Sequence, residues 1–556
     1  MVKYVFVTGG VMSGIGKGIT AASIGKLFQF RGYSVDIIKI DPYLNVDPGV
    51  LNPIEHGEVF VTEEVWDFTP VPNVIFRISE IDQDFGTYER FLDKNIHPRN
   101  NITSGQIFLS VLLKERRGEF LGRTVQIVPH ITDEIKKRIR LVAEKSNADI
   151  IIVELGGTIG DIEGMPFVEA IRQLSLEEGR KNSAIVHVAY VPFLSKVGQL
   201  KTKPAQHSVK TLQSLGLQPD IVVGRADIPL TDDVRAKIAM YCNVPEYAVI
   251  SSSYIDIVYE MPLNFESQGL GDTLCRILEL PIKAPDTSQW VDMTKLFKSA
   301  NKTVNIAMPG KYCAIIDSYI SINEALKHAG AHLGAKVNIK WIDTLQFEQN
   351  PQTLSMLKQF DGILLTPGFG FRGVEGMILT AQFAYEQRIP FLGICFGAQL
   401  MFVAFCRKAL NLPKANSTEV DPNTPDPVVD LLPEQKQLVE KGGTMKLGGH
   451  RIFIKKGTRL YEAYKRDVVV ERFRHRFHII NEYAEKAESK GLTVSSYDES
   501  GSIINSIEIN NGNWMVGVQF HPEFKSRPNS PSPVYYEFIK QALKRREFEP
   551  PQISFG

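Results

Sequence analysis

Short runs of β-branched residues recur along this chain, and each closes in Gly or Asp before a helical pattern begins. In the first half they lie at 35–40, 149–155, 184–191 and 220–223, and in the second half at 304–308, 337–342, 362–365 and 391–394. Strands that alternate with helices pair in parallel and are covered on both faces. The pattern therefore predicts an α/β chain built on doubly wound parallel sheets.

The length sets the number of domains, because 556 residues exceed what one hydrophobic core supports. A strand-poor stretch at 280–302, which contains Pro281 and Pro285, is the predicted linker. We therefore predict a first domain at 1–279, a second at 303–546, and a tail at 547–556.

Charge and cysteine content narrow the possible partners. The 63 Lys and Arg residues balance 63 Asp and Glu residues, so we expect no nucleic-acid or membrane partner. The basic clusters at 114–117 and 136–140 are interpreted as solvated helix faces or phosphate contacts. Five scattered cysteines indicate a reducing compartment. Without a signal-peptide pattern after Met1, and without an apolar run of roughly 20 residues, we expect a cytoplasmic protein.

The second half contains a candidate nucleophile, Cys395, in the sequence Gly-Ile-Cys-Phe-Gly at 393–397. A Gly-x-nucleophile-x-Gly turn between a strand and a helix holds the nucleophile in a tight, exposed position. The dipole of the following helix favours the thiolate. Taken alone, the pattern fits a buried cysteine in a glycine-containing loop better.

A second segment changes that balance. His521 and Glu523 follow a predicted strand at 516–520, and residues two apart in an extended segment face the same side. Glu523 is therefore expected to orient the His521 ring, as in a nucleophile–base–orienter site. Gly368, in the Thr-Pro-Gly-Phe-Gly run after another strand, and Phe396 are the expected backbone donors to an oxyanion.

These segments together resemble the class I (triad) glutamine amidotransferases. The resemblance implies catalysis by Cys395, His521 and Glu523, with glutamine hydrolysed through a thioester. It also implies a set of glutamine-binding residues: Gly368, Phe396, Gly397, Ala398, Gln399, Glu419 and an arginine of the run 472–476, taken as Arg476. By itself, that arginine run is better explained as a basic strand face.

The first half carries a glycine-rich turn at 8–18 between its first strand and a helix. Backbone N–H groups at a helix N-terminus bind phosphates, and Lys17 adds a positive charge. The turn is not a strict Walker A loop, because Gly18 stands where Ser or Thr is required. Acidic residues after nearby strands, among them Glu154, suit Mg²⁺ shared with phosphates. Each segment taken singly is equally well explained as a capped turn.

Taken in order, the motifs of nearly the whole chain resemble the CTP synthase family. They include the turn at 8–18, Lys-Ile-Asp-Pro-Tyr at 39–43, Glu-His-Gly-Glu-Val-Phe-Val at 55–61, Pro-His-Ile-Thr at 129–132, and the Gly-Gly-Thr-Ile-Gly-Asp-Ile-Glu run at 156–163. The resemblance implies amination of UTP to CTP through a 4-phosphorylated intermediate, with ammonia passing through an internal channel. The implied ligands are Mg²⁺, ATP, UTP and glutamine, with GTP as activator and CTP as feedback inhibitor.

The resemblance also implies roles for individual residues of the first half. Those for ATP are Gly14, Ile15, Gly16, Lys17, Gly18, Ile19, Lys39 and Asp84, with Lys17 catalytic. Those for UTP and CTP are Ser13, Asp161, Ile162, Glu163, Lys201, Thr202, Lys203, Pro204, Ala205, Gln206 and Lys237. The implied metal ligands are Asp84 and Glu154. Family members form homodimers that pair into homotetramers, and filaments are a further possibility.

Three alternatives stay open at this point. The segment 63–79 replaces a short turn of the family, and it is either an extended surface hairpin or a contact with another subunit. An ATP-dependent amidotransferase with a different acceptor for ammonia is the second alternative. A catalytically weak, filament-forming scaffold is the third alternative, which the intact residues Cys395, His521, Glu523 and Lys17 disfavour.

Overall fold

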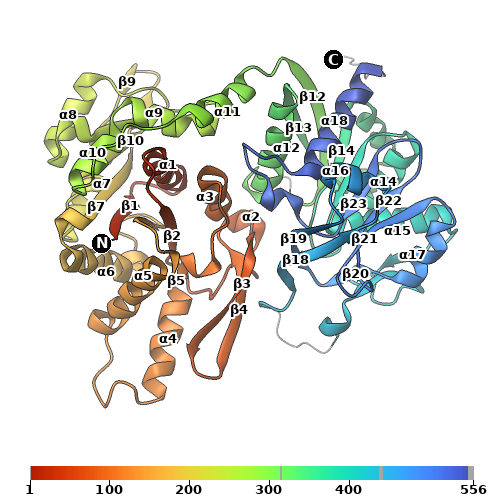
Figure 1. The fold of residues 1–556 in the computed structure, drawn as a ribbon, viewed down its shortest axis with the longest axis horizontal. Coiled ribbons are helices and arrows are strands. Elements are labelled where there is room, and N and C mark those ends of the chain that lie inside the picture. Colours follow the sequence, from red (N-terminus) through yellow and green to blue (C-terminus); the bar gives the residue numbers. More distant parts are fainter. Residues whose placement is uncertain (1, 313–315, 437–441, 549–556) are drawn as a thin grey trace. The chain divides into compact units, whose positions relative to one another are not determined.

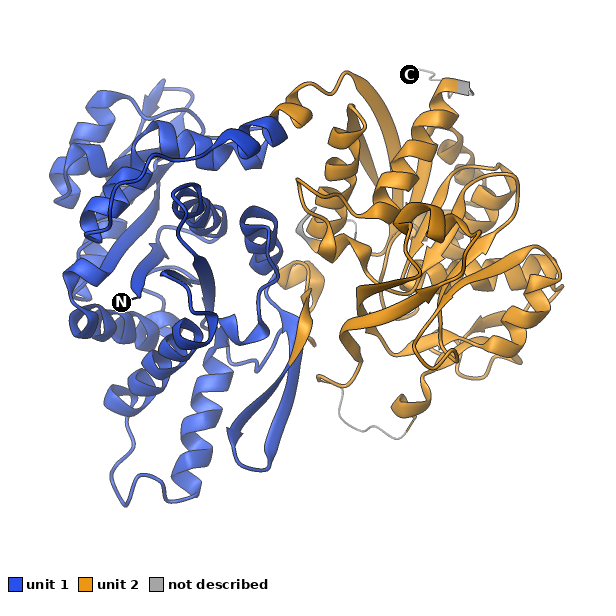
Figure 2. Cartoon of the chain, viewed as in Figure 1, with its two compact units in different colours: residues 1–48, 66–294 blue, residues 49–65, 295–556 orange. Residues whose placement is uncertain are grey.

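The computed structural model describes residues 2–312, 316–436 and 442–548. Cys313 and residues 549–556 of the predicted tail lie outside the described residues. Contacts divide the chain into two compact units, one of residues 1–48 and 66–294 and one of residues 49–65 and 295–556 (Figure 2). The last change of grouping along the chain falls within helix α11 (Ser288–Lys298), inside the predicted linker. Both units are α/β, as the strand pattern predicts.

The first unit is built on a parallel sheet in the order β11-β10-β7-β1-β6-β2-β5 (Figure 1). Its strands, in sequence order, are β1 (Lys3–Gly9), β2 (Val35–Asp41), β5 (Asn101–Thr103), β6 (Ile150–Leu155), β7 (Ser183–Tyr190), β10 (Ile221–Arg225) and β11 (Val249–Ser252). The four strands predicted in this half are confirmed as β2, β6, β7 and β10. Since all neighbours run parallel, their carboxyl ends meet at one edge of the sheet.

Helices cover both faces of this sheet. Helices α4 (Ser104–Arg116), α5 (Thr132–Ser146) and α6 (Met165–Glu178) pack Ile107, Ile135 and Phe167 into one apolar cluster with β1 and β6. The opposite face carries α1 (Lys17–Phe30), whose Gly25 lies beside Ile152 of β6. Burial on both faces explains why these strands are apolar throughout rather than alternating.

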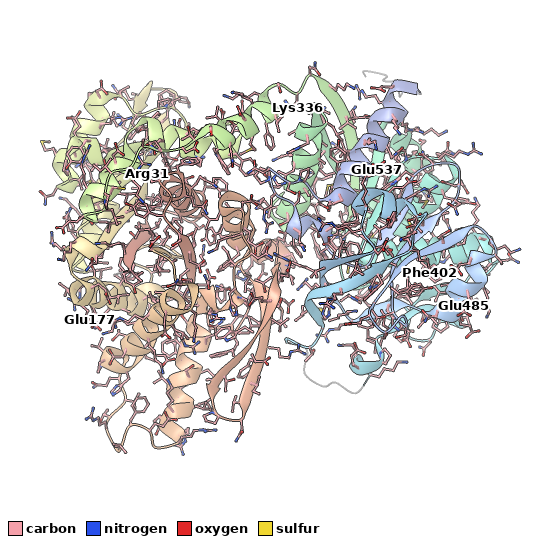
Figure 3. The ribbon with its side chains drawn as sticks, viewed as in Figure 1. Arg31, Glu177, Lys336, Phe402, Glu485 and Glu537 are labelled. Carbon is pink, nitrogen blue, oxygen red and sulfur yellow. The ribbon has the colours of Figure 1, made fainter. Side chains whose placement is uncertain are left out.

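Arg31, labelled in Figure 3, ties the end of α1 to two later helices. Its guanidinium donates to both carboxylate oxygens of Glu266 in α9 (Met261–Ser267), at 2.7 and 2.8 Å, and to Asp272 in α10 (Leu270–Ile277) at 2.5 Å. The Arg31 side chain is fully buried, so the two carboxylates supply the charge compensation that burial requires.

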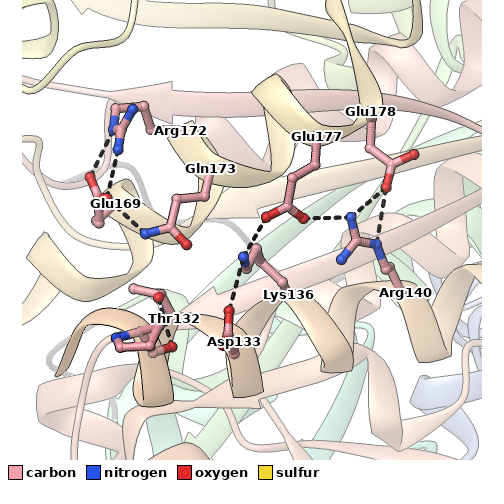
Figure 4. Close-up of polar contacts among 10 residues, drawn as sticks. Thr132, Asp133, Lys136, Arg140, Glu169, Arg172, Gln173, Glu177 and Glu178 are labelled. Atoms are coloured by element: carbon pink, nitrogen blue, oxygen red, sulfur yellow. Dashed lines mark hydrogen bonds and ion pairs between the residues drawn. The ribbon is translucent and has the colours of Figure 1, made fainter. Parts of the chain in front are cut away.

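The basic cluster at 136–140 joins α5 to α6 (Figure 4). Lys136 pairs with Glu177 at 2.5 Å and with Asp133 at 3.0 Å, and Arg140 pairs with Glu177 and Glu178, each at 2.7 Å. These side chains therefore form ion pairs, most of them between α5 and α6. Of the two interpretations made from the sequence, the structure favours a charged helix face.

The segment 63–79 forms most of a hairpin, with β3 (Phe60–Val71) and β4 (Val74–Ile81) paired around Pro72 and Asn73. Phe68 on β3 is 1% exposed, and the Arg138 guanidinium lies 4.7 Å from its ring centroid. The apolar face of the hairpin is thus covered by its own chain. This packing supports the surface-hairpin interpretation, and a contact with another subunit stays a prediction.

The second unit contains a mixed sheet in the order β13-β12-β14-β15-β23-β22-β21-β18-β19. Its strands are β12 (Lys302–Gly310), β13 (Ala335–Asp343), β14 (Gly362–Leu365), β15 (Phe391–Ile394), β18 (Lys446–Ile454), β19 (Val468–His475), β21 (Leu492–Tyr497), β22 (Ile504–Ile509) and β23 (Met515–Val518). The strands predicted in this half are confirmed as β12 to β15. From β13 to β23 neighbouring strands are parallel, and from β23 to β19 they are antiparallel.

This sheet also has an apolar cluster on each face. Helices α14 (Val374–Glu386), α15 (Phe396–Ala409) and α17 (Asn481–Glu488) pack on one side, and α12 (Ile320–His332), α16 (Arg459–Tyr464) and α18 (Pro533–Phe548) pack on the other. In the described part of the chain, no helix is long and apolar enough to cross a membrane.

Candidate functional site

Cys395 lies at the sharp turn between β15 and α15, where it is the residue before the first turn of the helix. Its φ is 51°, in the left-handed region that residues with a Cβ rarely adopt. The flanking glycines make this turn possible. A Cβ on Gly393 would lie 2.8 Å from the Gly397 carbonyl oxygen, and one on Gly397 would lie 2.3 Å from that of Leu365. The predicted nucleophile turn is therefore present in the structure, but Cys395 is buried in it and not exposed as predicted.

His521 and Glu523 follow β23, which is the neighbour of β15 in the sheet. His521 Nδ1 lies 2.7 Å from Glu523 Oε1, and the other oxygen of Glu523 accepts from the Tyr535 hydroxyl at 3.4 Å. The pair forms in a 3-10 turn, Pro522–Lys525, and not in the extended segment expected from the sequence. The proline and this turn bring the carboxylate back toward the ring.

The charge state of His521 is governed by its neighbours. Burial by itself would lower the pKa of His521, but Glu523 and Cys395 outweigh it and raise the pKa to about 10. Within the described residues, Nε2 of His521 has no hydrogen-bond partner. The nitrogen that is not held by Glu523 is thus free to exchange a proton with a neighbouring group.

One pocket brings the candidate catalytic residues together, and every residue that lines it belongs to the second unit. Cys395, His521, Glu523 and Gly368 all contribute to its wall. The other lining residues are Pro53, Glu58, Val59, Tyr312, Ser318, Tyr319, Pro367, Phe369, Arg474 and Phe524. Three of these come from the segment 49–65, which the sequence pattern did not connect with this site.

Two side chains hold the loop after β14 that carries Gly368. Lys311 Nζ donates to the carbonyl oxygens of Phe369, at 3.0 Å, and Gly370. Glu419 Oε1 accepts from the Gly370 N–H at 2.8 Å. Burial lowers the pKa of Lys311 to about 8 against the opposing effect of Glu419. Lys311 thus holds the loop by two carbonyl groups, and Glu419 holds it by one N–H group.

The residues predicted to bind glutamine divide into two groups. Gly397, Ala398 and Gln399 continue from Cys395 into the first turn of α15. Arg476, in contrast, donates to Gln435 and Thr444, both at 2.8 Å, while Arg474 of the same run lines the pocket. Arg472 is fully buried and donates to the Val61 carbonyl at 2.8 Å. The arginine closest to the candidate nucleophile is therefore Arg474.

The glycine-rich turn of the first unit lies between β1 and α1, at the carboxyl edge of the parallel sheet. Gly14 and Gly16 have φ values of 73° and 88°, which explains the glycines at these positions. Lys17 Nζ donates to the Gly157 carbonyl oxygen at 2.6 Å, and so links this turn to the loop after β6. Burial lowers the pKa of Lys17, while the charge of Glu154 acts in the opposite direction.

Beside this turn, Lys39 at the end of β2 bridges the two carboxylates predicted to hold a metal. Its ammonium pairs with Asp84 and, at 2.9 Å, with Glu154. Glu154 also accepts from the Tyr88 hydroxyl. Burial raises the pKa of Glu154, and Lys39 opposes that rise. Asp84 and Glu154 thus converge on the Lys39 ammonium, and both offer oxygen atoms as ligands. Such a pair of carboxylates fits Mg²⁺ that is shared with substrate phosphates.

The residues predicted to bind UTP fall on four segments, of which the glycine-rich turn contributes Ser13. Asp161 accepts from the Thr158 N–H at 2.9 Å in the loop after β6. The run 201–206 leads into helix α7 (Lys203–Ser214), where Gln206 donates to Thr202 at 2.9 Å. Lys237 lies exposed on α8 (Asp232–Cys242). The loop after β6 follows a strand of the seven-stranded sheet, whereas the run 201–206 follows β9 (Gln199–Leu200) of a separate two-stranded sheet.

A buried histidine that the sequence did not single out links α7 to β1. His187 on β7 contacts the Thr8 hydroxyl through Nδ1 at 2.9 Å and the Ser208 hydroxyl through Nε2 at 2.7 Å. A Cβ on Gly10 would lie 1.8 Å from the Ser208 oxygen, so the start of the glycine-rich turn packs directly on this network. Burial, reinforced by the charge of Lys17, lowers the pKa of His187 to about 3.

Lys311 and Gln519 are two further polar residues near the candidate nucleophile that the sequence pattern did not single out. Lys311 follows the last residue of β12, and Gln519 lies two residues before His521. Both residues follow strands, at the edge of the sheet where Cys395 lies. Functional residues gather after the carboxyl ends of parallel strands, so the position that indicated Cys395 would also have indicated these two.

Comparison with known proteins covers nearly the whole chain. Residues 3–280 match the family model described as CTP synthase N-terminus, and residues 314–541 match glutamine amidotransferase class-I. A CTP synthase of Pyrococcus abyssi is 50% identical over 98% of this chain and 99% of its own length. One from Caldanaerobacter subterraneus is 48% identical over 98% of each chain. A solved glutaminase domain of Trypanosoma brucei CTPS with bound acivicin is 31% identical, with a TM-score of 0.41, and covers 43% of this chain and 94% of that one.

Proposed function

The chain belongs to the CTP synthase family of glutamine-hydrolysing enzymes, and we propose that it aminates UTP to CTP through the residues described above. In this proposal the second unit releases ammonia from glutamine, and the first unit activates UTP with ATP. The observation that carries it is the pocket in which Cys395, at the N-terminus of a helix, is accompanied by the His521–Glu523 pair.

Glutamine hydrolysis begins when the Cys395 thiolate, whose proton is already held by Nε2 of His521, attacks the side-chain amide carbon. The N–H groups of Gly368 and Phe396 are assigned to the oxyanion that forms. His521 then protonates the leaving nitrogen, ammonia departs, and a thioester remains. Water, deprotonated by His521, cleaves the thioester to glutamate. Glu523 holds the ring in the tautomer that these transfers need.

The glutamine-binding residues of the proposal are Gly397, Ala398, Gln399 and Glu419, with Arg476 and the pocket-lining Arg474 as alternatives for one contact. The half-buried carboxylate of Glu419 suits an α-ammonium group. Its present bond to the Gly370 N–H also couples substrate binding to the loop that carries Gly368.

The second reaction transfers the γ-phosphoryl group of ATP to the 4-oxygen of UTP, and ammonia then displaces phosphate. Lys17 and the N–H groups at 14–19 neutralise and position the phosphates. Bound Mg²⁺ supplies further charge neutralisation on the phosphates, with Asp84 and Glu154 as its protein ligands. Lys39 stays beside both carboxylates and contacts the same phosphates.

UTP is assigned to Ser13, residues 161–163, residues 201–206 and Lys237, and CTP as inhibitor to an overlapping site. GTP as activator of hydrolysis, an internal passage for ammonia and assembly into dimers and tetramers belong to the same proposal. The support for each of these proposals is the membership of the chain in the family.

The test is an absorbance assay with UTP, ATP, Mg²⁺ and glutamine, with and without GTP. We expect CTP to form, and ammonium chloride to replace glutamine. Amination of another acceptor in place of UTP would support an amidotransferase of different specificity. No turnover with either nitrogen source would support the scaffold alternative.

A further inference from the structure

The sulfur of Cys395 has two polar neighbours that lie outside the triad. It lies 3.6 Å from the carbonyl oxygen of Arg474, a distance at which the thiol S–H donates. On another side, the side-chain amide nitrogen of Gln519 donates to it at 3.4 Å. We propose that Gln519 is a further catalytic residue of glutamine hydrolysis, whose amide N–H stabilises the Cys395 thiolate. This inference rests on the proposed function of Cys395.

The identity of the atom that faces the sulfur follows from a chain of hydrogen bonds. The carbonyl oxygen of Phe477 only accepts, so the group of Gln399 that lies 2.9 Å from it is the NH₂. The same NH₂ lies 3.0 Å from the Gln519 side chain, which must present its oxygen there. The NH₂ of Gln519 is therefore turned toward Cys395. An amide assignment that is ambiguous by shape alone is settled by the network.

Each contact stabilises either the thiol or the thiolate form of Cys395, depending on whether it accepts or donates a hydrogen bond. The Arg474 carbonyl oxygen accepts from the thiol but repels a negative sulfur. An N–H donor does the opposite, because a hydrogen bond to the charged form favours that form. Gln519 is 2% exposed and Cys395 is 4% exposed, and in such a poorly solvated place a single donor has a strong effect. Gln519 thus offsets the carbonyl group when the proton moves to His521.

The position of Gln519 is fixed by the fold. It follows β23 directly, and its backbone N–H donates to the Asn505 carbonyl at 2.8 Å. His521 lies two residues further, and its N–H donates to the Arg472 carbonyl at 2.8 Å. One short segment therefore places two groups beside the sulfur of Cys395: the proton acceptor His521 and Gln519, the hydrogen-bond donor to the thiolate. Cys395 itself lies at the start of α15.

The test is the alkylation of Cys395 by iodoacetamide over a range of pH, in the full-length chain. The modified peptide is identified by mass spectrometry. Cys242, Cys275 and Cys406 are each fully buried, whereas Cys395 lines a pocket, so among the described cysteines the reagent is expected to reach Cys395. The Cys395→Ser variant gives the background from all other thiols.

Gln519→Glu is the sharpest variant, because it keeps the shape and the acceptor for Gln399 but replaces the donor at the sulfur. We expect alkylation at pH 7 and glutamine hydrolysis each to fall roughly 10- to 100-fold, the effect of one hydrogen bond to a charged group. The alkylation profile should move to higher pH. Gln352→Glu makes the same chemical change on an exposed residue and should leave the profile in place.

Gln399→Glu keeps Gln519 itself and provides a second route to the same result. It replaces the NH₂ that orients Gln519, so the Gln519 amide should turn over and present its oxygen to the sulfur, with the same shift of the profile. Near-ultraviolet circular dichroism checks that both variants fold. If either variant does not fold, the other decides. A folded Gln519→Glu with the wild-type profile would overturn the inference.

The same experiment separates this inference from the proposed function. If Cys395→Ser retains glutamine-dependent CTP formation, the proposed nucleophile is wrong and the role of Gln519 falls with it. If Cys395→Ser is inactive with glutamine while Gln519→Glu is alkylated like the wild type, the proposed function stands and only the role of Gln519 fails.

Discussion

Oε1 of Glu523 lies 2.7 Å from Nδ1 of His521, in a turn where both side chains are buried. Nδ1 of His521 is therefore held by Glu523, and Nε2 is left for proton transfer. It also explains why a fully buried imidazole keeps a positive charge over a wide pH range, since burial alone would remove that charge.

Replacing Glu523 by Gln should lower the pKa of His521 from about 10, because the main charge that raises it is removed. The protonated imidazole then persists over a narrower range, and its upper limit moves to lower pH. We expect glutamine hydrolysis to fall roughly 10²- to 10⁴-fold. The pH dependence of kcat for glutaminase activity measures both effects. An unchanged profile would show that Glu523 does not govern the charge of His521.

Cys395→Ala should abolish CTP formation from glutamine and leave CTP formation from added ammonium chloride. The reason is that the pocket containing Cys395 is built entirely by the second unit, whereas the phosphate-binding turn belongs to the first. Parallel assays with the two nitrogen sources measure this. Loss of activity with both would contradict the division of labour.

Lys17→Ala should remove CTP formation with either nitrogen source, because the phosphoryl transfer is common to both. Lys17 is buried and bonded to the Gly157 carbonyl oxygen, so the variant loses a charge beside the phosphates and a link between two loops. Lys145→Ala, an exposed residue of α5, is the matched control. Normal ammonia-dependent turnover in Lys17→Ala would rule out the phosphate-loop assignment.

Glu154→Gln and Asp84→Asn should each raise the Mg²⁺ concentration needed for half-maximal activity, by roughly 10-fold or more. Each variant removes one of the two carboxylates that converge on Lys39. The measurement is a Mg²⁺ titration at constant ionic strength, with Asp133→Asn on α5 as control. Equal Mg²⁺ dependence in all variants would move the metal site elsewhere.

His187 predicts a loss of stability in acid. Its pKa in the folded protein is about 3 and that of an unperturbed histidine is 6.5, so between these values the unfolded chain binds a proton that the folded chain does not. Its contribution to stability is complete above pH 6.5 and is lost as pH falls toward 3, by about 1.4 kcal/mol per pH unit.

The His187→Gln variant lacks this titration and should show a shallower decline in acid. Hydrogen exchange of peptides from β1 and β7, followed between pH 4 and pH 7, compares the two proteins locally. Parallel declines in the wild type and the variant would show that His187 is not the group responsible.

Much of this molecule is predictable because the controlling interactions are local. Strands such as β14 and β15 are apolar on both sides since helices cover both faces of the sheet, and that pattern is visible in a few consecutive residues. The turn around Cys395 is equally local, because Gly393 and Gly397 leave room that no other residue would leave. The same holds for the positive φ values of Gly14 and Gly16.

The arrangement of the candidate sites depended on contacts between distant parts of the chain. The approach of Glu58 and Pro53 to the pocket of Cys395, and the place of Arg474 rather than Arg476 in its lining, have no signature in spacing or composition. Each follows from which strands become neighbours in a sheet.

The sequence by itself therefore determined the α/β class, the positions of several strands in each sheet, and the candidate residues Cys395, His521, Glu523 and Lys17. Only the tertiary structure decided that His521 meets Glu523 in a 3-10 turn and that Gln519 turns its NH₂ toward the sulfur. The physical reason is that backbone periodicity and glycine conformation act within a few residues. The direction of a buried hydrogen bond, by contrast, is set by a chain of donors and acceptors that assembles only when the sheet and its helices have packed.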